Sequence, residues 1–139
     1  MLPGSWFYAY FREAFFFPMH IEAFRAHCLG KPGVTEEFPF GEFTLVFKVM
    51  GKVFALTDVQ SHPLSFNVKC DPERAVQLRE TYPCVTPGYH MNKRHWNTVV
   101  ADGSVPDRLL AGWVDHSYDL VVAGLPKKQR AELEAARGA

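Results

Sequence analysis

The sequence lacks net charge, a cysteine pattern and any apolar run long enough to span a membrane. Fifteen basic and fifteen acidic side chains cancel, so the chain has no overall positive field of the kind with which many nucleic-acid-binding proteins attract phosphate. Its three cysteines, Cys28, Cys70 and Cys84, form no C-x-x-C pair. This odd count indicates neither a disulfide framework nor a cysteine zinc site, and we interpret all three as reduced, structural thiols.

Residues 1–18 are rich in aromatics but have the pattern of neither a signal peptide nor a membrane span. Arg12 and Glu13 interrupt them, no basic region precedes an apolar core, and no small-residue cleavage site follows. We therefore expect a cytoplasmic protein without a membrane segment. Two interpretations of residues 1–18 stay open: an N-terminal arm that packs on the domain or on a partner, or a start codon that is set too early.

The remaining chain has the composition of one ordinary globular domain. Of the 139 residues, 47% are apolar and 22% are charged, which fits a single folded unit with a sizeable core. We expect this domain to cover residues 19–135 and to be a monomer.

Apolar periodicity predicts the element order αβββαβαα. The helices are expected over Met19–Leu29, over Pro72 to Tyr82 after an Asp71 cap, over Pro106–Ala123, and from Pro126 onward. The strands are expected over Thr44–Val49, Val53–Thr57, Ser65–Cys70 and Trp96–Ala101, with a tight turn at Gly51. This order predicts an α+β fold in which a mainly antiparallel sheet is backed by helices.

Two details of this prediction concern particular side chains. In the second helix, Ala75, Val76 and Leu78 are expected to point inward. Glu36 and Glu37, placed in a turn, are expected to form a solvated acidic edge.

The segment from Tyr89 to Asn97 is the best functional candidate, because basic, amide and aromatic side chains gather there. Lys93 and Arg94 are the only charged residues from 83 to 101, whereas four aspartates face one arginine from 102 to 119. The two cations can pair with phosphates, and Tyr89 or Trp96 could stack on an exposed base. Together with other basic positions, the candidate nucleic-acid-binding residues are Lys69, His90, Asn92, Lys93, Arg94, His95, Lys127 and Lys128.

A structural interpretation of the same segment also stays open. Trp96 opens a strand and is interpreted as a core residue. Asn92 and Asn97 could serve only to fix the loop through hydrogen bonds to the backbone.

No pattern in the sequence indicates catalysis, a metal or a cofactor. His90, His95 and His116 come without an H-E-x-x-H helix, a cysteine pair or a nearby carboxylate. Ser117 lies inside a helical pattern rather than on a strand-turn-helix elbow, and no glycine belongs to a phosphate-binding motif. We therefore expect no catalytic residues, no metal ligands and no cofactor.

Several sequence blocks in the same order resemble the MmcQ/YjbR family, over about residues 19 to 133. These blocks are Pro32–Phe40, Leu45–Val49, Lys52–Leu56, Asn67–Glu73, Pro87–Asn97, Asp115–Tyr118 and Gly124–Lys128. The resemblance implies a fold similar to frataxin-like and double-wing domains, together with a DNA-binding role that rests largely on fold analogy.

Two functional hypotheses follow. One is a DNA-binding module that uses the basic loop, and the other is a protein-interaction module that uses the same loop or the aromatic residues 1–18. Salt dependence separates them, because an affinity due to phosphate neutralisation falls steeply with salt, whereas an aromatic protein contact changes little.

Overall fold

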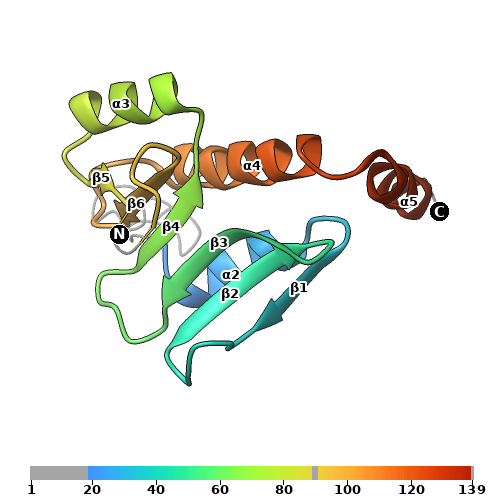
Figure 1. Cartoon of the computed structure of the whole chain (residues 1–139). Coiled ribbons are helices and arrows are strands. Elements are labelled where there is room, and N and C mark those ends of the chain that lie inside the picture. Colours follow the sequence, from blue (N-terminus) through green and yellow to red (C-terminus); the bar gives the residue numbers. More distant parts are fainter. Residues whose placement is uncertain (1–18, 89–90, 139) are drawn as a thin grey trace, which may run out of the picture.

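The computed structural model describes residues 19–88 and 91–138. Residues 1–18, Tyr89 and His90 therefore lie outside the part that we describe. Figure 1 shows the arrangement of the elements. They are α2 (Ile21–Leu29), β1 (Val34–Glu37), β2 (Thr44–Val49), β3 (Lys52–Asp58), β4 (Ser65–Lys69), α3 (Pro72–Thr81), β5 (Val85–Pro87), β6 (Trp96–Val100), α4 (Asp107–Ala123) and α5 (Lys127–Arg137).

The strands form one antiparallel sheet in the order β1-β2-β3-β4-β6-β5. The predicted α+β fold class, with a mainly antiparallel sheet backed by helices, is confirmed. The predicted turn between β2 and β3 is confirmed as well: Met50 and Gly51 have φ of 49° and 82°, the left-handed pair that a tight hairpin requires.

The helices α2, α3 and α4 pack on one face of the sheet, and aromatic contacts mark the core there. The Phe24 ring of α2 lies 5.7 Å from the Phe47 ring and 4.7 Å from the Phe66 ring, centroid to centroid. The Tyr118 ring of α4 lies 5.4 Å from that of Phe54. Such offset and edge-to-face pairs add to the stabilisation from burying the rings.

The opposite face of the sheet, which we call the open face, carries no helix of the described part of the chain. Residues opposite one another in an antiparallel sheet point to the same side. One such row crosses all six strands on the open face, and it consists of Glu37, Val46, Leu56, Asn67, Thr98 and Thr86.

The structure adds two short edge strands to the predicted order. Strand β1 occupies the stretch that was expected to be a turn, and β5 lies within the expected loop after Pro83. With four and three residues, both are too short for an alternating pattern to be recognised, and both are fixed by pairing with longer neighbours.

One inward-facing assignment was wrong. Val76 of α3 is 47% exposed, whereas Ala75 is fully buried. Leu78 of helix α3 packs against the core, whereas Val76 lies on the exposed side, because α3 lies over the edge of the sheet near β5. Its start was predicted correctly, since the Asp71 carboxylate accepts a hydrogen bond from the Arg74 amide (3.3 Å).

Candidate nucleic-acid interface

Five of the candidate residues lie together where β4 ends and β6 begins. Lys69 is the last residue of β4 and lies opposite Trp96, the first residue of β6. The Cys70 amide donates to the His95 carbonyl oxygen at 2.7 Å, which continues the ladder past the end of β4. We call the set Lys69, Asn92, Lys93, Arg94 and His95 the basic corner.

A tight turn presents the two cations of the basic corner. The Asn92 carbonyl accepts hydrogen bonds from the His95 amide (3.2 Å) and the Trp96 amide (2.9 Å). The Asn92 side-chain oxygen accepts from the Arg94 amide at 2.9 Å. The structural role expected for Asn92 is therefore present, and the turn it fixes leaves Lys93 and Arg94 exposed.

Arg79 of α3 holds this turn from the helix side. Its Nε donates to the Asn97 side-chain oxygen at 2.7 Å, and its Nη2 donates to the carbonyl oxygens of Lys93 and, at 3.3 Å, Trp96. Asn97 is 1% exposed, so the guanidinium satisfies a buried acceptor. Sequence reasoning missed Arg79, because an arginine in the last turn of a helix has no distinctive pattern.

Close packing also fixes the approach to the basic corner. A Cβ atom added at Gly88 would lie 2.8 Å from the Trp96 Cβ and 3.0 Å from the Trp96 carbonyl oxygen. Only glycine allows the chain to run this close to β6. Trp96 itself is half-buried on the open face and is not part of the helix-covered core, contrary to its interpretation as a core residue.

The structure places Lys127 and Lys128 away from this corner. Lys127 and Lys128 are exposed in the first turn of α5. Figure 1 shows α5 at the opposite end of the molecule from β5 and β6. His90 lies outside the described residues.

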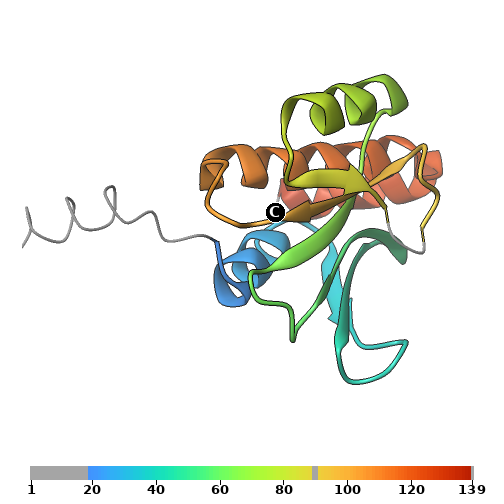
Figure 2. The same cartoon turned by 90° about the vertical axis from the view of Figure 1, so that its left-hand side faces the viewer.

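A second exposed surface was missed in the sequence. Phe38, Phe40 and Phe43 are 49%, 79% and 46% exposed in the connection between β1 and β2, which we call the aromatic loop. Figure 2 shows this connection and the coloured part of the β5–β6 connection, residues 91–95, on the same side of the molecule. The three phenylalanines were visible in the sequence, but no periodic pattern separates exposed aromatics from core aromatics in so short a segment.

Three carboxylates lie in or beside the aromatic loop, and two of them are neutralised by cations. Glu36 accepts from the Arg25 Nε at 2.7 Å, and Glu37 is paired with Lys48. Glu42, within the loop, is exposed and takes part in no ion pair among the described residues. The aromatic loop is therefore mainly apolar, with one exposed carboxylate that disfavours phosphate there.

His116 and Ser117, considered above for metal or nucleophile roles, have structural contacts. The His116 Nε2 accepts a hydrogen bond from the Asp71 amide (3.3 Å). Burial, with a smaller contribution from Arg74, lowers the pKa of His116 and favours this neutral form. The Ser117 hydroxyl accepts from the Lys69 amide at 2.8 Å and donates to the Phe54 carbonyl at 2.5 Å.

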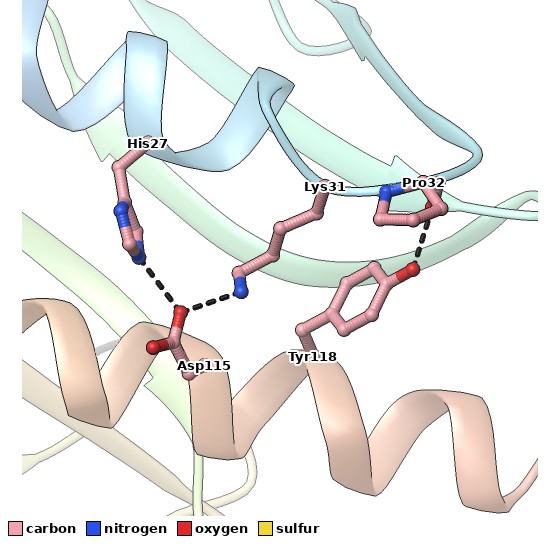
Figure 3. A network of polar contacts seen from close by, with 5 residues as sticks. All are labelled: His27, Lys31, Pro32, Asp115 and Tyr118. Carbon is pink, nitrogen blue, oxygen red and sulfur yellow. Dashed lines mark hydrogen bonds and ion pairs between the residues drawn. The ribbon is translucent and has the colours of Figure 1, made fainter. Parts of the chain in front are cut away.

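Asp115 and Tyr118 tie α4 to the end of α2, as Figure 3 shows. The Asp115 carboxylate lies 2.7 Å from His27 Nε2 and 2.5 Å from Lys31 Nζ. Burial raises the pKa of Asp115, but hydrogen bonds from Lys31 and His27 outweigh it and hold that pKa below its usual range. The Tyr118 hydroxyl donates to the Pro32 carbonyl at 2.6 Å.

Replacing Asp115 with asparagine is expected to lower the free energy of unfolding at pH 7 by about 1 kcal/mol or less, because the contacts of Asp115 with His27 and Lys31 are partly exposed. The pKa of the Asp115 carboxyl is lower in the folded state, so its contribution is present above the unfolded pKa and disappears as the pH falls through the folded pKa. Melting temperatures of the two proteins should therefore converge below about pH 4. Asp119→Asn, an exposed change on the same helix, is the control. An equal gap at pH 3 and pH 7 would show that the charge is not the cause.

The cysteines are free and buried. Burial raises the pKa of the Cys28 thiol to about 12 and also raises that of Cys70, which disfavours the reactive thiolate.

In residues 19–88 and 91–138 no three His, Cys, Asp or Glu side chains are grouped so as to hold a metal ion. No helix of the same residues is long and apolar enough to cross a membrane.

These features define a small α+β protein, with one antiparallel sheet, three helices on one face of it and an exposed basic turn at one corner. A family model described as YjbR matches residues 29–120. The chain therefore belongs to the YjbR family, as its sequence blocks indicate.

Relatives and solved structures support this assignment. The chain is 35% identical to the Escherichia coli K12 protein YjbR over 113 residues, which cover 81% of this chain and 95% of YjbR. It is 38% identical over 93 residues to YbdF of Escherichia coli O157:H7, covering 67% of this chain and 76% of YbdF. Both relatives are named as uncharacterized proteins.

Two crystal structures have the same fold. The DUF419 domain protein DR2400 of Deinococcus radiodurans is 44% identical with a TM-score of 0.78, covering 83% of this chain and 88% of the other. A Pseudomonas syringae protein has a TM-score of 0.55 with 21% identity, covering 86% and 98%. The second likeness concerns the fold alone.

Proposed function

We propose that this protein binds DNA weakly through the basic corner. The observation that carries this proposal is the exposure of Lys93 and Arg94 on a turn that Arg79 holds in place beside Lys69. A fixed turn loses little conformational entropy when its cations meet phosphates, so that most of the electrostatic attraction is available for binding.

The proposed role is binding rather than catalysis. In the described part of the chain, the side chains of His116 and Ser117 form hydrogen bonds with backbone groups. The thiols of Cys28 and Cys70 have raised pKa values. These hydrogen bonds give His116 and Ser117 structural roles in α4.

Replacing both Lys93 and Arg94 with alanine is expected to weaken DNA binding and to reduce the log–log salt slope by about 2. The physical reason is that two fewer counterions are released when two phosphate contacts are lost. The measurement is a fluorescence anisotropy titration of labelled DNA at several salt concentrations. With zero net charge, the starting affinity is expected to be only on the order of 10⁻⁴ to 10⁻⁶ M, so the series must begin at low salt.

A matched control removes the same charge elsewhere. The Lys127→Ala/Lys128→Ala protein loses two exposed cations at the far end of the molecule, and its slope should stay close to that of the wild type. The proposal is wrong if the wild type does not bind at low salt, or if the Lys93/Arg94 variant binds equally well.

A protein-interaction role is the second candidate, and the aromatic loop favours it. Three exposed phenylalanines framed by glutamates fit a partner segment that combines apolar and basic residues. Replacing Phe40 with serine would remove the most exposed apolar side chain of this surface and leave the basic corner intact.

A further inference from the structure

The open face of the sheet is chemically different from the helix-covered face, and it adjoins the basic corner. Lys69 and Trp96 lie opposite each other on this face, and both are half-buried. In the next row of the same two strands, the Thr98 hydroxyl donates to the Asn67 side-chain oxygen at 2.6 Å. A cation, an aromatic ring and an amide–hydroxyl pair therefore lie side by side on β4 and β6.

We propose that this surface takes single-stranded DNA in preference to duplex DNA. The inference rests on the proposed DNA-binding function and specifies the form of DNA that the site accepts. The partly exposed Trp96 residue offers a stacking surface for an unpaired base. Lys69, which lies opposite Trp96, can pair with the phosphate next to that base. The Asn67 amide can hydrogen-bond the edge of a base that lies flat on the sheet.

The width of the sheet favours single-stranded DNA over duplex DNA at this surface. Six strands spaced about 4.8 Å apart span roughly 24 Å, whereas the major groove of B-DNA is about 12 Å wide. The open face cannot enter that groove, and stacked bases in a duplex cannot reach Trp96. An unpaired base meets neither obstacle.

Charge limits the strand to one end of the face. At the β1 end of the cross-sheet row Glu37 neutralises the charge of Lys48, so this cation is not available to a phosphate, and the exposed Glu42 of the aromatic loop lies beyond it. The Glu42 carboxylate repels phosphates. The strand is therefore confined to β4, β6 and the basic corner, a site of only a few nucleotides, at the low end of the range for single-strand-binding domains.

The test compares one mixed-sequence 12-nucleotide strand with its own duplex, using the full chain at low salt and anisotropy as the readout. The single strand should bind at least ten-fold more tightly. In the Trp96→Leu protein, single-strand affinity should fall about ten-fold while duplex affinity stays unchanged, because only the unpaired base stacks on the ring.

A second variant keeps the inference testable if Trp96→Leu does not fold. Lys69→Gln should reduce the single-strand log–log salt slope by about 0.7, the value expected for one phosphate contact, whereas the Lys127→Ala/Lys128→Ala control should not. Equal binding of both forms, or a preference for duplex, would overturn the inference and leave the proposed DNA-binding function standing. Absence of binding to either form would overturn both.

Discussion

Replacing Ser117 with alanine is expected to lower the free energy of unfolding by about 2 to 4 kcal/mol. The Ser117 hydroxyl is fully buried and bridges two strands, since it accepts from the Lys69 amide and donates to the Phe54 carbonyl. Phe54 lies where the β2–β3 register shifts, and Lys69 ends β4. Alanine would leave an amide and a carbonyl without this partner in the interior.

Chemical denaturation with equal m-values checks this expectation. Ser104→Ala is the matched control, because that serine is exposed and, within the described part of the chain, its side chain bonds only to the nearby Asp102; its effect should stay within about 0.5 kcal/mol. A Ser117→Ala protein as stable as the control would mean that water or a local shift satisfies both backbone groups.

Regular patterns in the sequence were sufficient for most of the fold. The β2–β3 hairpin, the Asp71 cap and the apolar stripe of α4 each depend on local chemistry that is visible in the residues themselves. Strands β1 and β5 could not be predicted in this way, because three or four residues at an edge acquire their structure from a partner strand. Val76 was assigned inward for a related reason: helical spacing alone cannot show how much of α3 the core covers.

The candidate site was predicted only in part, because it depends on tertiary contacts. The proximity of Lys69 to residues 92–95 follows from the pairing of β4 with β6, across α3 and β5. That pairing could not be read from the sequence, and neither could the distance of Lys127 and Lys128 from this corner. The hypothesis of a basic loop stays a prediction about binding, although the structure now defines which side chains share one surface.

The blocks that carry the family resemblance are explained largely by packing. Gly88 permits close approach to Trp96, Ser117 bridges two strands, and Tyr118 fixes the Pro32 carbonyl. Such contacts account for a shared fold without indicating a shared ligand. Lys93 and Arg94 differ, because among the described residues neither side chain forms an ion pair or a hydrogen bond within the protein. Packing therefore does not explain their presence in the Pro87–Asn97 block.

Arg79 connects packing with the proposed function, and replacing it with alanine is expected to cost about 2 to 4 kcal/mol of stability. The change removes the donors to the Lys93 and Trp96 carbonyls and leaves the buried Asn97 oxygen without its partner. Arg79→Lys should recover little of this loss, since a single ammonium cannot reproduce the planar donor set that spans three acceptors. Arg74→Ala, an exposed change on the same helix, is the control and should have little effect on thermal unfolding.

DNA titration of the same Arg79→Ala protein distinguishes a positioning role from a phosphate contact. If Arg79 acts by fixing the turn, affinity should fall while the log–log salt slope stays that of the wild type, because Lys93 and Arg94 still release their counterions on binding. A slope reduced by about 1 would instead place the guanidinium on a phosphate. Unchanged stability together with unchanged affinity would show that Arg79 is not needed to hold the basic corner in place. The hydrogen bonds that the Asn92 carbonyl and side-chain oxygen accept within the turn would then be sufficient.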